Sequence, residues 1–331
     1  MSDKKLIAVI GATGAQGGGL ARAILADRDG DFAVRAVTRN PDSDNGKALA
    51  AAGAEVVAAD LDDEASLAAA FGGAFGAYCL TNFWEHFSGE KEEAQAANLA
   101  RAAKSAELEH VIWSTFEDTR DSVPLDDDRM PTLQGKYKVA HFDAKAVGDK
   151  EFEAAGVPTT FLLTSFYWEN FIYFAMGPAR GEDGVLGVTY PMGDKKLPSI
   201  AVEDIGKCAY GLFKTGDKYL GKTVGIAGGE PTGADIAAAF SKALGEEVRY
   251  NDVPAAVNSW FPTALASKCA TLYFPCSVGI RSSSRGIDSR VSSKVDQITC
   301  SSPALFAARA RLPACASSFS PEKCSQKFVR Q

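Results

Sequence analysis

Residues 5–17 of this chain of 331 residues read KLIAVIGATGAQG and give the strongest indication of its fold class. The apolar, partly β-branched run Lys5–Ile10 predicts a buried strand, and an Ala-rich helix is predicted from about Ala15 to Ala26. A strand, a glycine-rich turn and a helix in this order form a dinucleotide-binding motif. The segment therefore predicts a nucleotide site at Gly11, Ala12, Thr13, Gly14, Ala15, Gln16 and Gly17.

The three glycines of this turn have different physical roles. Gly11 permits a tight turn, Gly14 lets the backbone approach a pyrophosphate, and Gly17 allows close helix–strand packing. The unpaired N–H groups at the start of the helix then face the phosphates. The GxxGxxG spacing is typical of short-chain dehydrogenase-like sheets, and an ordinary glycine turn is the alternative.

Alternating short β-branched runs and Ala-rich amphipathic runs continue through residues 1–262. This alternation predicts a parallel sheet with helices on both faces. Further strands are predicted at 33–38, 55–59, 76–81, 110–114, 159–164 and 223–227, and helices at 46–52, 63–71, 88–106, 142–155, 203–214 and 233–244. A Gly- and Pro-rich stretch at 177–198 predicts a hairpin. We therefore expect an α/β fold: a Rossmann-type doubly wound parallel sheet in residues 1–165 and a small interleaved lobe in residues 166–262.

The last 69 residues differ from the rest in charge and composition. Residues 1–262 carry a formal charge of −14, whereas residues 263–331 carry +7 and five of the seven cysteines. This stretch has no sustained hydrophobic period, so we predict a disordered Ser- and Cys-rich tail. A shifted reading frame or an unspliced intron would also produce such a break. The cysteines lack close CxxC pairs and all three histidines lie far upstream, so no metal site is expected.

Composition and charge also exclude several classes of function. The net charge of −7 argues against direct nucleic-acid binding, which needs a basic face. The most apolar window, residues 156–179, is interrupted by Glu169 and Asn170, so we expect no membrane span. Met1–Lys5 runs directly into the first strand without a signal peptide, and we expect a cytoplasmic protein.

The end of the second strand predicts which dinucleotide is bound. An NAD site has an acidic residue there to hold the ribose 2′-hydroxyl, but this chain has Thr38, Arg39 and Asn40. A guanidinium can bind a 2′-phosphate with a charge-assisted hydrogen bond, so we expect NADP; a solvated surface arginine is the alternative. Asp60 and Leu61 follow the third strand, where the adenine edge lies in folds of this kind, and we expect Asp60 to accept from the adenine amine. Helix capping with Asp62 or Asp63 is the alternative explanation. The cofactor-binding candidates at the end of the fourth strand are Thr81, Asn82 and Phe83.

Five motifs occur in the order found in a known family. GATGAQGG (11–18), TRNP (38–41), TNFWE (81–85), AHFDAK (140–145) and SFYWENF (165–171) together resemble the NmrA-like family of atypical short-chain dehydrogenase/reductase relatives, most closely its redox-sensor group. The resemblance covers about residues 4–260 and stops at about Trp260. It implies an NADP-binding Rossmann fold whose usual Tyr-x-x-x-Lys pair has lost its tyrosine.

The resemblance also assigns roles around the nicotinamide. In this chain His141 stands in the place of the tyrosine, and Lys145 is expected to hydrogen-bond the nicotinamide ribose. Thr115 stands in the place of the dehydrogenases' serine. His141 is either a general acid or, as we favour, a histidine packed near the cofactor. Tyr137 lies two helical turns before Lys145 and cannot simply replace the lost tyrosine. Tyr167, Trp168, Glu169 and Asn170 either close the nicotinamide pocket or belong, with their neighbouring phenylalanines, to an aromatic core.

Two functions follow from these expectations. The first is a regulatory, redox-sensing NADP(H)-binding protein that acts through a protein partner or a homodimer. The second is an NADPH-dependent reductase of a carbonyl, quinone or imine, in which water or His141 supplies the proton. NmrA-like relatives include transcriptional co-regulators, so the resemblance adds a nuclear role to the cytoplasmic one.

Overall fold

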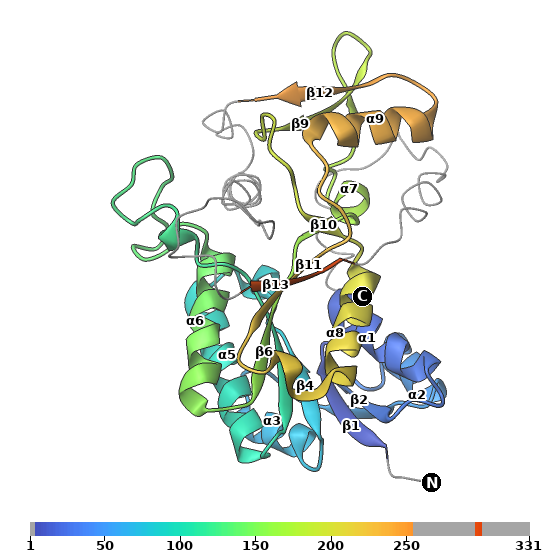
Figure 1. Ribbon diagram of the computed structural model, residues 1–331, viewed down its shortest axis with the longest axis vertical. Helices are drawn as coiled ribbons and strands as arrows, with labels where there is room; N and C mark the ends of the chain where they lie inside the picture. The colour runs from blue at the N-terminus through green and yellow to red at the C-terminus, as the bar shows by residue number, and fades with distance from the viewer. Residues whose placement is uncertain (1–3, 254–294, 300–331) are drawn as a thin grey trace.

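The computed structural model describes residues 4–253 and 295–299. A sheet covered by helices forms one part, and a smaller lobe lies beyond one end of it, at the top of Figure 1. Within the described residues the sheet has eight strands, all paired in parallel, in the order β13-β11-β6-β5-β4-β1-β2-β3. These strands are β1 (Lys5–Ile10), β2 (Phe32–Thr38), β3 (Glu55–Ala58), β4 (Gly76–Cys79), β5 (His110–Thr115), β6 (Thr159–Leu163), β11 (Thr223–Ala227) and β13 (Val295–Thr299).

The expected Rossmann-type sheet is therefore confirmed. The chain winds outward from β1 to β3 and then returns to place β4 on the other side of β1. In sheets of this kind ligands bind at such a reversal, outside the carboxyl ends of the strands. The reversal between β1 and β4 brings together the residues that follow β1, β2 and β4.

Alternate residues of β1 pack into two cores, one on each face of the sheet. Ile7 and Val9 pack with the helices α1 (Ala15–Ala26), α2 (Asp44–Ala51) and α8 (Val202–Lys214). Ala8 and Ile10 pack with α3 (Glu64–Phe71), α5 (Gly89–Ser105) and α6 (Ala140–Ala155). A strand covered on both faces is apolar throughout, which explains the uninterrupted run LIAVI.

The small lobe is interleaved with the sheet. It contains β7 (Phe166–Tyr167), α7 (Asn170–Tyr173), β8 (Ala179–Arg180), β9 (Leu186–Tyr190) and β10 (Ser199–Ile200), followed after β11 by α9 (Gly233–Leu244) and β12 (Val248–Asp252). Strands β8 and β9 pair antiparallel and form the expected hairpin. The sequence did not predict β12, a short and mostly polar strand that pairs in parallel with β9.

The tail differs in part from its expectation. Residues 295–299 form β13, an edge strand paired with β11, where we expected no regular structure. The other residues of the tail, its five cysteines and the lobe boundary at 262 lie outside the described residues.

Two short 3₁₀ helices, η1 (Thr119–Asp121) and η2 (Gly216–Tyr219), and the single-turn helix α4 (Phe83–His86) complete the described elements. Across the described part of the chain, no helix is both long and apolar enough to span a bilayer.

Candidate functional site

The glycine turn after β1 has the geometry that a dinucleotide needs. Gly11 has a φ of +61°, in the left-handed region. A Cβ atom on Gly17 would lie 2.5 Å from the Ile10 carbonyl oxygen, so only glycine lets α1 approach the strand this closely. Gly14 is exposed at the N-cap of α1, where the described residues supply no side-chain cap and the first turn carries no acidic residue. The backbone N–H groups at the start of α1 are therefore suited to a phosphate, and the turn fits a dinucleotide.

The end of β2 places Arg39 beside this turn, but with a partner that the sequence did not indicate. Its guanidinium forms an exposed ion pair with the carboxylate of Glu85 in α4. We expected no carboxylate at this position, because none follows β2 directly. Thr38 and Asn40 shape the turn around Arg39: the Asn40 amide faces the Thr38 hydroxyl at 3.4 Å, and Asn40 Oδ1 accepts from Asp42 N at 3.1 Å.

The residues after β3 mainly shape their own loop. Asp63, rather than Asp60, caps α3, since its carboxylate accepts from the amides of Ala65 and Ser66. Asp60 Oδ1 accepts from Asp62 N at 2.9 Å, and the Leu61 carbonyl accepts from Asn98 Nδ2 at 2.8 Å. The role of Asp60 and Leu61 at an adenine stays a prediction.

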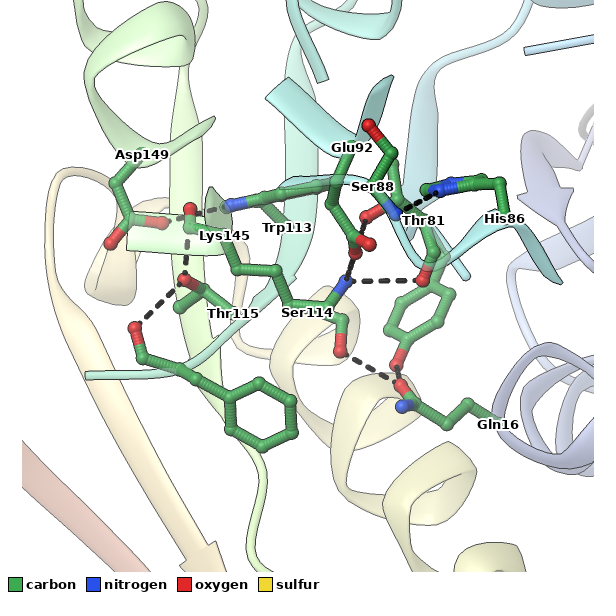
Figure 2. Close-up of polar contacts among 12 residues, drawn as sticks. Gln16, Thr81, His86, Ser88, Glu92, Trp113, Ser114, Thr115, Lys145 and Asp149 are labelled. Atoms are coloured by element: carbon green, nitrogen blue, oxygen red, sulfur yellow. Dashed lines mark hydrogen bonds and ion pairs between the residues drawn. The ribbon is translucent and has the colours of Figure 1, made fainter. Parts of the chain in front are cut away.

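Lys145 lies in a buried polar cluster with Glu92 and Thr81 (Figure 2). Its ammonium lies 3.0 Å from Glu92 Oε1 and donates to the Thr81 hydroxyl at 2.8 Å and to the Thr81 carbonyl at 3.1 Å. The Thr81 hydroxyl in turn donates to Glu92 Oε1 at 2.5 Å. An ammonium has three protons, so these contacts use its full donor capacity. Lys145 must therefore give up one of these contacts before it can bind a ribose hydroxyl.

His141 lies in an aromatic environment. Its ring centroid is 4.7 Å from that of Trp84, 4.9 Å from Phe142 and 5.5 Å from Phe83, and the side chain is buried. Phe83 and Trp84 belong to α4, whose first residue follows the exposed N-cap Asn82. This packing agrees with the interpretation of His141 as a packed histidine.

The described tyrosines near the site are poor proton donors. Tyr137 donates to Glu93 Oε1 at 2.7 Å, and burial raises the pKa of its hydroxyl to about 12. Burial likewise raises the pKa of Tyr167 to about 12. A catalytic tyrosine needs a pKa close to the working pH, and both pKa values are shifted in the opposite direction.

Thr115 was expected in the place of a serine. Its hydroxyl donates to the Phe116 and Lys145 carbonyls at 3.3 Å and 3.4 Å.

Gln16 of the glycine turn is the centre of a second polar network (Figure 2). Its Oε1 accepts from the Tyr78 hydroxyl at 2.6 Å and from the Ser114 hydroxyl at 2.8 Å. Its Nε2 donates to the hydroxyl of Tyr167 in β7. One side chain thus joins β4, β5 and the start of the small lobe to the turn.

The aromatic segment after β6 is divided between the two parts of the molecule. Tyr167 packs against the core beneath α1, whereas Trp168 packs with Phe166 and Phe171 in the core of the lobe. Glu169 accepts a hydrogen bond from Val202 N at 3.1 Å, at the start of α8, and Asn170 begins α7. This arrangement favours the aromatic-core interpretation for Trp168.

Sequence reasoning missed four residues of these networks: Tyr78, Glu85, Ser114 and Glu92. Glu85 lies within the TNFWE motif and Ser114 next to Thr115, so both were near a recognised signal. Tyr78 lies within a buried strand and Glu92 in the first turns of a long, acid-rich helix, where acidic residues are ordinary. Glu92 differs from its exposed neighbours Glu90 and Lys91 in lying on the helix face of Ala96 and Leu99, four and seven residues further on, a local signal that the motifs did not include.

The strand order and the glycine turn at the sheet reversal define an NAD(P)-binding protein of the Rossmann class. The chain belongs to the NmrA-like family, whose family model matches residues 3–299. The match continues past Trp260 and includes β13, so our expectation that the resemblance stops there was wrong.

Curated relatives include oxidoreductases of this family. The oxidoreductase FrzB of Cladobotryum sp. is 31% identical over 271 residues, which cover 75% of this chain and 76% of the relative. The oxidoreductase malD of Malbranchea aurantiaca is 30% identical over 262 residues, with 75% and 76% covered.

Similar solved structures include a transcriptional regulator and an oxidoreductase. NmrA, a negative transcriptional regulator crystallised with NADP, is 27% identical with a TM-score of 0.64, over 76% of this chain and 75% of that one. The NADPH-dependent quinone oxidoreductase QOR2 of Escherichia coli, complexed with NADPH, is 25% identical with a TM-score of 0.64, over 82% and 89%.

Proposed function

We propose that this protein binds NADP(H), with the pyrophosphate on the Gly11–Gly17 turn and the 2′-phosphate on Arg39. The observation that carries the proposal is the juxtaposition of a glycine turn that fits a dinucleotide with an exposed guanidinium at the adjacent strand end. The NADP complex of NmrA and the NADPH complex of QOR2 support it. When bound, the nicotinamide ring would supply hydride-transfer chemistry.

The proposed role is regulatory: the protein senses the cofactor and signals to a protein partner or a second copy of itself. Support comes from the absence of a tyrosine with a lowered pKa among the described residues near Lys145. Position 141 holds a histidine enclosed by aromatic rings, and the hydroxyls of Tyr137 and Tyr167 have raised pKa values. A ligand signals only if it has a different affinity for two conformations. NmrA, a regulator of similar fold, agrees with this role.

Calorimetric titration of the full chain with NADP⁺, NADPH, NAD⁺ and NADH tests the proposal. We expect NADP⁺ to bind more tightly than NAD⁺, and Arg39→Gln to reduce NADP⁺ affinity about tenfold or more, because it removes a charge-assisted bond. Arg28→Gln changes an exposed arginine at the opposite end of α1 and is the matched control. Equal binding of the phosphorylated and unphosphorylated coenzymes would refute the assignment.

An NADPH-dependent reductase is the second candidate, favoured by the relatives named as oxidoreductases. NADPH oxidation measured against a panel of carbonyls, quinones and imines separates the two roles. Turnover that is lost in His141→Ala while NADPH binding persists would establish the reductase. Binding without turnover, with NADP⁺ and NADPH differing in their effect on oligomeric state or partner capture, would establish the regulator.

A further inference from the structure

The Arg39–Glu85 ion pair crosses the strand that carries the glycine turn. Arg39 follows β2 and Glu85 belongs to α4, which follows β4, whereas β1 lies between β2 and β4 in the sheet. A side-chain contact between residues that follow the two strands flanking β1 therefore passes over the carboxyl end of β1. That is the position of the Gly11–Gly17 turn. The ion pair, which we call the Arg39–Glu85 bridge, lies across the crevice assigned to the dinucleotide.

The bridge also occupies the group assigned to the 2′-phosphate. Both side chains are about half exposed, at 64% for Arg39 and 46% for Glu85, so water and a ligand can compete for them. Exposed ion pairs contribute at most about 1 kcal/mol, because solvent screens them and ordering the side chains costs entropy. A phosphate carries more charge and more acceptor oxygens than a carboxylate, and it can displace Glu85 from the guanidinium.

We propose that Glu85 is a specificity-determining residue of the cofactor site: it holds Arg39 until a 2′-phosphate replaces it. The inference rests on the proposed NADP(H) function. A coenzyme with a 2′-phosphate opens the bridge, whereas NAD⁺ has no group that competes for Arg39. Glu85 thus reduces NADP⁺ affinity below the value that a free Arg39 would give, and couples the nature of the coenzyme to α4.

The structure of α4 connects the bridge to the region around His141. Phe83 is buried and anchors the start of the helix, while Trp84 and Glu85 are exposed. Trp84 contacts the His141 ring, with centroids 4.7 Å apart, and lies next to Glu85 in a helix of a single turn. Opening of the bridge therefore changes the surroundings of Trp84, which makes its fluorescence a readout that needs no turnover.

A double-mutant cycle tests the proposal. We expect Glu85→Gln to raise NADP⁺ affinity about two- to fivefold, as loss of an exposed competing pair allows, with NAD⁺ affinity unchanged. In an Arg39→Gln background the Glu85→Gln change is expected to have no effect. Glu246→Gln is the control, because Glu246 pairs with Arg180 in the small lobe at similar exposures of 47% and 54%. NADP⁺, but not NAD⁺, is expected to change the Trp84 emission, identified by its loss in Trp84→Phe.

The outcomes separate the bridge from the function on which it rests. Preferential NADP⁺ binding by the wild type with the same NADP⁺/NAD⁺ ratio in Glu85→Gln overturns the bridge alone. An effect of Glu85→Gln that persists in the Arg39→Gln background would mean simple repulsion of the phosphate, and also overturns it. Wild-type protein that binds neither coenzyme overturns both proposals.

Discussion

Lys145 is held by protein groups on all of its donors, although its place in the sequence suggested a ligand for the cofactor. Glu92, its ionic partner, is fully buried, and its second oxygen has no hydrogen-bond partner among the residues that the structure describes. The ion pair with Glu92 thus fastens α6 to α5, and the bonds to Thr81 fasten it to the end of β4. Because Thr81 lies between β4 and α4, the lysine also fixes the segment that leads into α4.

This arrangement predicts an unusual order of stabilities. Lys145→Met leaves the Glu92 carboxylate buried without a counterion, and we expect a loss of about 3–5 kcal/mol in the free energy of unfolding. The double variant Lys145→Met/Glu92→Leu removes both charges and is expected to be more stable than the single variant. Urea unfolding of the wild type and both variants measures these values. A double variant no more stable than Lys145→Met would show that the pair is not isolated from solvent.

At the scale of elements, the contact between α1 and α8 sets how the cofactor turn is supported. A Cβ atom on Gly206 of α8 would lie 2.1 Å from the carbonyl carbon of Gly19 and from the amide nitrogen of Leu20 in α1. The two helix backbones touch at this point. Helix α1, which begins at the glycine turn, is therefore supported by direct backbone contact with α8, whose residues lie far away in the sequence.

This contact predicts opposite effects of one substitution at two positions of α8. Gly206→Ala must push the helices apart, and we expect a loss of about 1–3 kcal/mol despite alanine's better helix propensity. Gly211→Ala is the matched control, since a Cβ there meets nothing within 4 Å, and it is expected to stabilise by up to about 1 kcal/mol. Thermal and urea unfolding compare the two. Stabilisation by both substitutions would contradict the close contact.

For the whole molecule, β7 is the place where the sheet and the small lobe are joined near the cofactor turn. Successive side chains of this segment alternate: Phe166 and Trp168 pack into the lobe core, and Tyr167 turns back to bond Gln16. Gln16 also bonds Tyr78 and Ser114 from the central strands. A change at the turn can therefore reach the lobe through a single amide.

We expect Tyr167→Phe to cost about 1 kcal/mol of stability and to weaken this connection, because it leaves Gln16 Nε2 without its acceptor. Backbone amide hydrogen exchange, measured with and without NADP⁺, tests whether the glycine turn and the lobe are connected through Gln16 and Tyr167. In the wild type NADP⁺ is expected to slow exchange at the glycine turn and at residues 166–173, and in Tyr167→Phe at the turn alone. Tyr250→Phe removes a hydroxyl that bonds the Tyr190 carbonyl within the lobe, and is the control. Unchanged protection of residues 166–173 in Tyr167→Phe would refute the connection.

Local sequence determined much of this protein. The run Lys5–Ile10 and the glycines after it predict a strand, a turn and a helix, and the alternation downstream predicts the parallel sheet. These signals are local because hydrophobic period and glycine geometry act over a few residues. Arg39 could also be recognised as a neighbour of the turn, because the two follow neighbouring strands. The strand β12 was missed because it is short and mostly polar, and is defined by its pairing with β9.

The partners of each site residue depend on how the elements pack in three dimensions. Glu85, Glu92 and Gln16 meet partners that lie 46, 53 and 151 residues away in the chain, at Arg39, Lys145 and Tyr167. Ion pairs and side-chain hydrogen bonds depend on distances between elements, which no local spacing encodes. The sequence thus indicated the glycine turn and several polar groups at the neighbouring strand ends, whereas the packing of α4, α5 and α6 against the strands decided which side chains are paired.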